Sequence, residues 1–272
     1  MSTDPLVIGA RTALLDALGA LRPHLDSLIL IGAQAVYLHT GGAEVALPEM
    51  TKDSDIALDT RSLADLPRLE TAMRQAGFHH DHVSPQPGSW FNDSGMPVDL
   101  MVPDALAGAG GRRGARIPPH SKSAARRAVG LEAAIVDNTL MRIGALTPHD
   151  QRTFTTKVAS PAALLVAKLH KIGERTSTPE RLIDKDAHDL YRLLVATPTD
   201  QLAKALNRLQ KDPLADHVTQ LALTWLADLF AAGPDAQGSI MAGRAEQGIG
   251  DPAVVSAAVS TLATDVIAAL DG

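Results

Sequence analysis

The chain of 272 residues contains no cysteine. Without cysteine there is no disulfide scaffold, no zinc site with thiolate ligands and no cysteine nucleophile. Aromatic residues make up only 3% of the chain, so a core has to be built mainly from Ala, Leu, Val and Ile. Because Ala and Leu are good helix formers, this composition favours helices.

Targeting signals are also missing from the sequence pattern. The amino terminus has no basic region before its apolar residues, and Asp4 comes early, so we do not expect a secretory signal. The apolar run from Leu28 to Leu38 is interrupted by Gln34 and is too short to cross a bilayer. We therefore expect a cytoplasmic protein with no membrane partner.

The net charge of −6 is unevenly distributed along the chain. Between Ala105 and Leu131 there are no acids, and the segment 112–127 carries six cations: Arg112, Arg113, Arg116, Lys122, Arg126 and Arg127. Such a segment suits an anionic partner such as a nucleic acid. A solvated, mobile loop would have the same composition, and both interpretations stay open at this point.

Hydrophobic periodicity changes near Ser160 and predicts an α+β fold with two domains, 1–159 and 160–272. Apolar runs predict a mixed sheet in the first domain, with strands at 27–31, 55–59, 78–84, 89–92, 96–102, 133–142 and 152–158. Helical spacing predicts helices there at 5–21, 33–39 and 63–76. After Ser160, an N-cap followed by proline, it predicts a helical bundle, with helices at 161–175, 180–195, 199–210, 214–231 and 252–270.

Carboxylates are the most informative side chains of the first domain. Asp53 and Asp55 are two residues apart at the start of a predicted strand, so both point to the same face. Asp99 lies among apolar residues on a later strand, where an unpaired carboxylate is costly. If the two strands are neighbours, the three carboxylates could hold Mg²⁺, which prefers oxygen ligands. Alternatively, Asp53 and Asp55 are turn residues.

A second feature precedes these carboxylates. Ile31 ends a predicted strand, Gly32 follows, and a helix is predicted from Ala33. A strand, a glycine and a helix start present backbone N–H groups and a positive helix end to an anion such as a phosphate.

Together these motifs resemble the nucleotidyltransferase superfamily of the polymerase-beta kind, and more narrowly the AbiEii/MenT-type toxin nucleotidyltransferases. The resemblance spans residues 25–195. Its motifs are Gly32-Ala33, Thr51-Lys52-Asp53-Ser54-Asp55, Asp99, Ala167-Lys168-Leu169-His170 and Lys185-Asp186-Ala187-His188-Asp189-Leu190. Ala33 departs from the family pattern, which has glycine or serine there. Because alanine has no hydroxyl, we expect weaker phosphate binding.

The resemblance implies a set of site residues. The catalytic residues would be Asp53, Asp55, Asp99 and Lys168, and the first three would also hold Mg²⁺. The nucleotide would be bound by Gly32, Ala33, Thr51, Lys171, Asp186 and Asp189. From the residues alone, Lys168, Lys171 and Arg175 share one helix face, which could equally be a solvated face. Asp186 and Asp189 could likewise belong to a surface ion-pair helix.

The implied activity is transfer of a nucleoside monophosphate from an NTP to an acceptor hydroxyl. The family points to RNA as acceptor, especially the 3′ end of tRNA, and to a toxin paired with a cognate antitoxin protein. Two alternatives stay open: the same chemistry on a small molecule, as in antibiotic-modifying enzymes, and a binding module for NTP or RNA without turnover.

Overall fold

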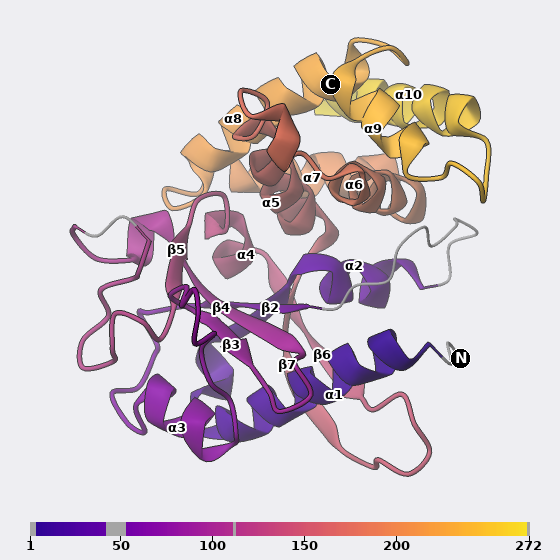
Figure 1. Ribbon diagram of the computed structural model, residues 1–272. Coiled ribbons are helices and arrows are strands. Elements are labelled where there is room, and N and C mark those ends of the chain that lie inside the picture. Colours follow the sequence, from indigo (N-terminus) through magenta and orange to yellow (C-terminus); the bar gives the residue numbers. More distant parts are fainter. Residues whose placement is uncertain (1–3, 42–52, 111–112, 271–272) are drawn as a thin grey trace. The chain divides into compact units, whose positions relative to one another are not determined.

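The computed structural model describes residues 4–41, 53–110 and 113–270 (Figure 1). The chain forms two compact units, one of residues 1–35 and 50–159 and the other of residues 36–49 and 160–272. The domain boundaries predicted from the sequence remain a prediction, and residues 36–49 group with the second unit.

The first unit is built on one sheet, which has seven strands within the described residues. The strand order is β3-β4-β2-β1-β7-β6, with β5 pairing with β4. β1/β7, β2/β4 and β4/β5 are parallel pairs, whereas β1/β2, β3/β4 and β6/β7 are antiparallel. The strands are β1 (Leu28–Ile31), β2 (Ser54–Leu58), β3 (Ser89–Phe91), β4 (Pro97–Pro103), β5 (Arg126–Ala128), β6 (Asn138–Gly144) and β7 (Thr153–Ala159).

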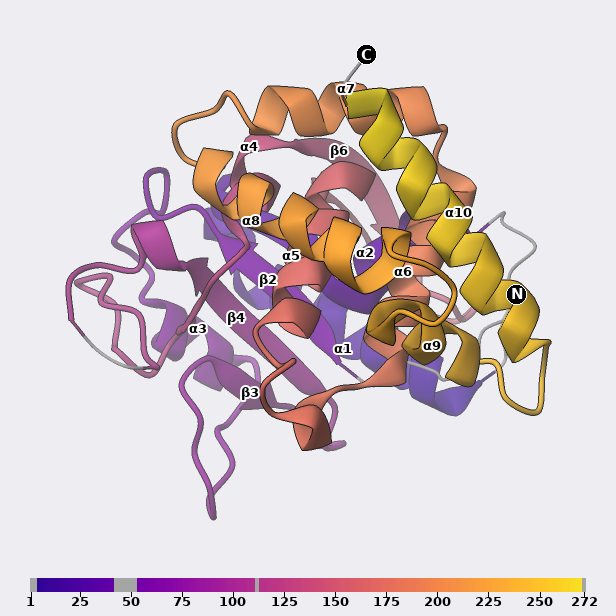
Figure 2. The ribbon, with the colours of Figure 1, turned by 90° about the horizontal axis from the view of Figure 1, so that it is seen from above.

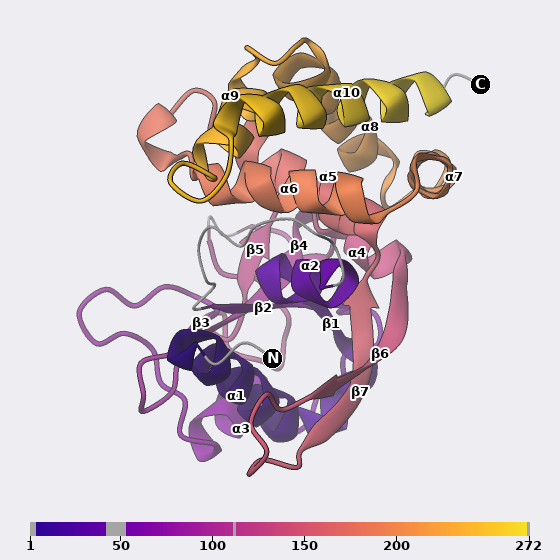
Figure 3. The same cartoon turned by 90° about the vertical axis from the view of Figure 1, so that its right-hand side faces the viewer.

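Helices cover both faces of this sheet. α1 (Pro5–Ala20) begins where the carboxylate of Asp4 accepts a hydrogen bond from Leu6 N at 2.7 Å. It packs on β2, β4 and β7 and beside α3 (Leu69–Gln75), as Figure 3 shows. α4 (Glu132–Val136) contacts β1, β2 and β7, and it lies on the face opposite α1 (Figure 1). Short 3₁₀ turns occupy Arg22–Ser27 and Asp104–Leu106.

The second unit is helical, and its first helix begins as the sequence predicts. Ser160 caps α5 (Pro161–Gly173) by accepting a hydrogen bond from Ala163 N at 3.2 Å. α5 packs against α8, and α10 packs against α7 and α9 (Figures 2 and 3). The further helices are α6 (Asp184–Ala196), α7 (Thr199–Leu209), α8 (Asp216–Leu226), a π-helical turn (Ala227–Ala231), α9 (Gln237–Arg244) and α10 (Pro252–Leu270), with a 3₁₀ turn at Pro179–Arg181. α2 (Gly32–Thr40) runs from β1 into residues of this unit.

The predicted α+β class, with a mixed sheet followed by helices, is confirmed. Three local predictions were wrong. The helix predicted at 63–76 begins only at Leu69, because Pro67 disfavours helical backbone at the residue before it. The strand predicted at 78–84 is reduced to a bridge between His79 and Phe91. The run 133–142 divides into α4 and β6, since its alanine-rich first half favours helix.

The sequence analysis also missed α9, a helix that contains two glycines. A Cβ on Gly238 would lie 2.5 Å from the ring of Phe230, and one on Gly243 would lie 2.4 Å from the carbonyl oxygen of Pro252. Glycine lowers the helical signal of a sequence, but here it allows close contact between helices.

α10 has a property that the sequence analysis did not consider. By length and composition it is long and apolar enough to cross a membrane. Its most apolar stretch of 18 residues has a mean hydropathy of 1.8, and 28% of that stretch is buried. Its buried side contacts α7 and α9. A single helix of this kind is weak support for a membrane span, because core helices of water-soluble proteins meet the same criterion. The absence of a membrane partner stays a prediction.

Candidate functional site

Two of the predicted carboxylates lie side by side on neighbouring strands. β2 and β4 pair in parallel, with Asp55 in register with Asp99. Residues in register on paired strands point to the same face of a sheet, so the two side chains share a face. Both are partly buried. The structure therefore brings together two residues that are 44 positions apart in the sequence.

Ser54 shows which face this is. Its hydroxyl is buried, donates to the carbonyl oxygen of Ala10 on α1 at 3.1 Å and accepts from Gln34 Nε2 at 2.7 Å. Since successive strand residues point in opposite directions, Asp55 faces away from α1. The side-chain oxygen Oε1 of Gln34 accepts from Arg11 Nε at 2.8 Å. The hydrogen bonds of the Gln34 side chain thus fix the first turn of α2 to the start of β2. The sequence analysis noticed Gln34 only as an interruption of an apolar run.

Gly32 connects β1 to α2 and accommodates the carboxylate of Asp55. Its φ is +70°, a backbone conformation that favours glycine. A Cβ at this position would lie 2.1 Å from Oδ2 of Asp55, so only a hydrogen fits there. The Asp55 carboxylate thus reaches the amino-terminal end of α2, where the helix dipole favours negative charge. This is the helix end that the sequence predicts as a phosphate site.

For the other described residues predicted in this region, the structure gives a position in the chain and a degree of burial. Asp53 is exposed and immediately precedes β2. Ala33 is buried, with 7% of its surface exposed, in the first turn of α2. Thr51 lies outside the described residues, as does Arg112 of the basic segment.

Asp99 forms an ion pair with a residue that the sequence analysis assigned to the basic segment. Nη2 of Arg126, on β5, lies 2.8 Å from Oδ2 of Asp99. The next residue, Arg127, pairs with Asp104 at 3.2 Å and donates to the carbonyl oxygen of Gly108. Two of the six cations of the segment are therefore neutralised by carboxylates of the same unit.

The remaining described cations of the segment are exposed, and we refer to Arg113, Arg116 and Lys122 as the exposed basic patch. The backbone around them is tied to the sheet. Trp90 Nε1 donates to the carbonyl oxygen of Ala124 at 3.0 Å, and Gly88 N donates to that of Ser123 at 2.9 Å. Together with β5, these bonds attach part of the segment to the sheet, and the two interpretations of its exposed cations, an anionic partner or a solvated loop, stay predictions.

The donor set suits a hard divalent cation, because carboxylate oxygens are the ligands that Mg²⁺ prefers. Among the described residues, however, no three His, Cys, Asp or Glu side chains are grouped closely enough to hold a metal ion. Asp99 is turned to Arg126, and Asp55 lies against Gly32. The residues fit the ion by chemistry, and the assignment of Asp53, Asp55 and Asp99 as its ligands stays a prediction.

In the second unit, the structure brings together Lys168, Lys171, Asp186 and Asp189. Lys168 Nζ donates to Oδ1 of Asp186 at 2.8 Å and to Oδ2 of Asp189 at 2.6 Å. Lys168 is only 6% exposed, and the two aspartates are 3% and 1% exposed. The structure therefore contradicts the two alternatives to a functional role. Lys168 does not lie on a solvated helix face, and Asp186 and Asp189 do not belong to a surface ion-pair helix.

Charges determine the protonation of this buried cluster. Burial alone would lower the pKa of Lys168, but the charges of Asp186 and Asp189 raise it well above its usual value. Burial alone would raise the pKa of Asp186, but Lys168 and Lys171 hold it well below its usual range. Lys171 Nζ lies 2.9 Å from Asp186 Oδ1, and its side chain is 40% exposed. Lys171 thus connects the buried cluster to solvent.

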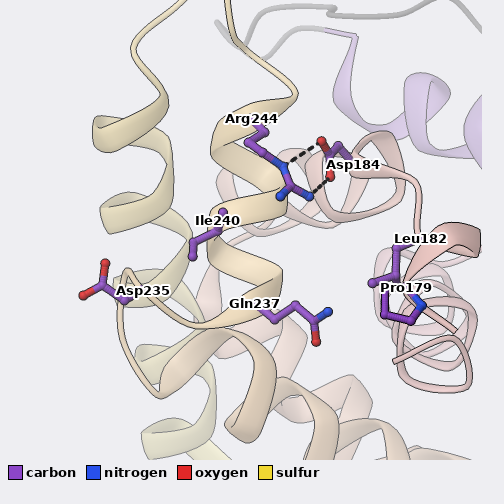
Figure 4. Close-up of a pocket in the computed structure, with 7 residues that line it drawn as sticks. All are labelled: Pro179, Leu182, Asp184, Asp235, Gln237, Ile240 and Arg244. Carbon is purple, nitrogen blue, oxygen red and sulfur yellow. Dashed lines mark hydrogen bonds and ion pairs between the residues drawn. The ribbon is translucent and has the colours of Figure 1, made fainter. Parts of the chain in front are cut away.

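A separate hollow lies in the second unit. It has a volume of about 560 Å³, and Arg244 and Asp184 form a bidentate ion pair on its wall, with N–O distances of 2.6 and 3.0 Å (Figure 4). Leu182 and Ile240 add apolar surface. None of the predicted site residues within the described part of the chain lines this hollow.

The family model described as Nucleotidyltransferase matches residues 10–222. No curated protein matches the chain. A crystal structure from H. pylori, of a protein supposed to be a nucleotidyltransferase, matches with 13% identity, a TM-score of 0.45 and coverage of 98% of this chain and 97% of that one.

Proposed function

The chain belongs to this nucleotidyltransferase family, and from that premise we propose that it transfers a nucleoside monophosphate from an NTP to a hydroxyl of RNA. One observation carries the proposal: Asp55 and Asp99 stand in register on parallel strands, with Asp55 at the amino-terminal end of α2. Within the superfamily, the sequence resembles the AbiEii/MenT-type toxins, and on that resemblance we propose the 3′ end of tRNA as acceptor.

We propose that Asp53, Asp55 and Asp99 hold Mg²⁺. When bound, the ion would neutralise charge on the phosphates during transfer. In the reaction, the acceptor oxygen forms a bond to the α-phosphorus, and the bond from that phosphorus to the oxygen bridging to the β-phosphate breaks. Pyrophosphate leaves with the electron pair of the broken bond. A carboxylate oxygen of Asp99 accepts the hydroxyl proton, which is a general-base role.

Backbone N–H groups at the start of α2 are proposed to contact the triphosphate. Gly32 and Ala33 contribute these groups, and the positive end of the helix dipole favours the anion. Ala33 offers no hydroxyl, so we expect modest NTP affinity. Thr51 is proposed as a further contact of the nucleotide on the basis of the resemblance alone.

The cluster of the second unit is proposed as a second group of functional residues. Lys171 is its solvent-facing cation and suits a phosphate, for which a lysine ammonium acts as a compact point charge. Lys168 is fully engaged by Asp186 and Asp189, so we propose that these three residues position the helix α5 that carries Lys171.

RNA is proposed as acceptor because of the exposed basic patch. Its three exposed cations lie on a segment without acids, and cations of this kind contact phosphates and position a nucleic acid without reading its sequence. A toxin role predicts that expression of the protein arrests growth, and that a cognate antitoxin protein relieves the arrest.

The deciding experiment is incubation with each α-³²P-labelled NTP, Mg²⁺ and total RNA. We expect label in RNA for the wild type and none for Asp53→Ala or Asp55→Asn. The matched control is Asp59→Asn, because Asp59 directly follows the same strand but pairs with Arg61 at 2.9 Å. Undiminished labelling by Asp55→Asn would contradict the proposal.

The same incubation, repeated with an aminoglycoside added as a second acceptor, separates the alternatives. Labelling of an aminoglycoside in place of RNA would indicate a small-molecule nucleotidyltransferase. Tight NTP binding without release of pyrophosphate from the NTP, whichever acceptor is present, would indicate a binding module.

A further inference from the structure

Arg126 shares a sheet face with the candidate metal ligands. It is the first residue of β5 and stands in register with Met101 of β4, two residues beyond Asp99. Because alternate residues of a strand point the same way, Arg126, Met101 and Asp99 face the same side. Nη2 of Arg126 lies 2.8 Å from Oδ2 of Asp99 and 3.3 Å from Sδ of Met101.

The two partners of this ion pair differ in burial. The side chain of Asp99 is 13% exposed, whereas that of Arg126 is 37% exposed. A carboxylate so deeply buried needs a nearby cation, and in this structure the guanidinium is one. Arg126, in contrast, has access to solvent and can leave the pair at smaller cost.

A divalent cation on Asp99 and the guanidinium of Arg126 have the same carboxylate as their target. Two cations at hydrogen-bond distance from one carboxylate oxygen repel each other, so occupancy by one weakens occupancy by the other. A displaced guanidinium is also well suited to a phosphate, because its planar donors match phosphate oxygens.

We propose that Arg126 neutralises Asp99 in the metal-free protein, competes with the divalent cation for this carboxylate, and binds the NTP phosphates once displaced. The inference rests on the proposed function, because it takes Asp99 as a ligand of the cation and an NTP as the substrate.

The test measures Mn²⁺ binding to the nucleotide-free protein by electron paramagnetic resonance. We expect Arg126→Gln to bind Mn²⁺ about tenfold more tightly than the wild type, the order expected for losing one neighbouring charge at a partly exposed site. Arg127→Gln is the matched control, since Arg127 follows on the same strand, points to the other face and pairs with Asp104. Its Mn²⁺ affinity should equal that of the wild type.

A second measurement uses an NTP analogue with an α,β-methylene bridge, which cannot be cleaved at that position, in the presence of Mg²⁺. Arg126→Gln should bind this analogue about tenfold more weakly, because a charged hydrogen-bond donor to the phosphates is lost. Tighter metal binding together with weaker nucleotide binding distinguishes the proposal from a merely structural role, which would weaken both.

A double-mutant cycle tests whether Arg126 acts through Asp99. In an Asp99→Asn background, Arg126→Gln should no longer change the Mn²⁺ affinity. If Arg126→Gln does not fold, Arg126→Lys replaces it, with a smaller gain of about threefold because an ammonium retains the charge but not the planar donors.

Unchanged or weaker Mn²⁺ binding by these Arg126 variants, or no detectable Mn²⁺ binding by any variant or the wild type, would overturn the inference. Failure of the proposed function would give a different result. Arg126→Gln would still bind Mn²⁺ more tightly than the wild type, but no NTP would label any acceptor.

Discussion

Lys168→Met removes the ammonium from the buried cluster, and the methionine side chain has nearly the same volume as the lysine side chain. The ammonium is within 2.8 Å of carboxylate oxygens of both Asp186 and Asp189, and all three residues are almost completely buried. Asp186 retains Lys171 at 2.9 Å and Arg175 at 3.8 Å, whereas Asp189 loses a direct ion partner. The variant therefore leaves a buried carboxylate without the ammonium that balances it.

Removing one partner of a buried ion pair typically costs about 3–5 kcal/mol. With a denaturant dependence of roughly 2 kcal/mol per molar urea, a loss of about 4 kcal/mol lowers the unfolding midpoint by about 2 M. Lys171→Met is the control, because its side chain is 40% exposed and exposed pairs contribute about 0–1 kcal/mol.

Trp225 provides the signal for this experiment. Its ring lies against Gly173, which ends α5, and its centroid is 4.9 Å from that of His170. The chain has two tryptophans, so a Trp90→Phe background isolates the fluorescence of Trp225 during urea unfolding. A loss for Lys168→Met no larger than that for Lys171→Met would refute the reasoning. Lys168→Met combined with Asp189→Asn should recover part of the loss.

Three further predictions concern the first unit. Gly32→Ala should lower the thermal midpoint by several degrees in a melting curve, because φ is +70° and the new methyl group would overlap Asp55; an unchanged midpoint would contradict this. Burial lowers the pKa of His120 below its usual 6.5, so stability should be full above pH 6.5 and fall as the pH drops through the lowered pKa. Urea unfolding between pH 5 and 7.5 measures this, and His120→Gln, unlike the exposed His149→Gln, should flatten the dependence. Neutralising the exposed basic patch with glutamines should weaken RNA binding and reduce the salt slope by about 2, whereas an unchanged slope would exclude these contacts.

The elements of the first unit that the sequence predicts well are those with strong local signals. Leu28–Ile31 is a buried apolar run, and Gly32 follows it as the residue that the turn into α2 requires. The pairing of β2 with β4 has no local signal, because register depends on contacts between residues distant in the sequence. The convergence of Asp55 and Asp99 could therefore be stated only as a condition.

Other features of the candidate site depend on packing that the sequence does not reveal. Arg126 belongs to a run of cations, and the composition of that run predicts an anionic partner outside the chain. The structure instead pairs Arg126 with Asp99. Gln34 interrupts an apolar run, and only the fold shows that it connects Arg11 with Ser54. Lys168 does carry a signal in the sequence, because a lysine between leucines on a core-facing helix needs a partner, and the structure supplies two.

Each buried or partly buried carboxylate among the candidate residues already has a favourable partner within its own unit. Asp55 has the amino-terminal end of α2, Asp99 has Arg126, and the two aspartates of the second unit have Lys168. On the proposed function, a metal ion or a nucleotide that binds at Asp55 and Asp99 does not gain the full attraction of these two charges, because it replaces an interaction that is already made. Binding is then an exchange of partners, and its net free energy is smaller than the local charges suggest. The same exchange predicts that cation and triphosphate bind together more tightly than either alone: the cation takes Asp55 and Asp99, and the phosphates take the backbone N–H groups at the start of α2 and the guanidinium of Arg126.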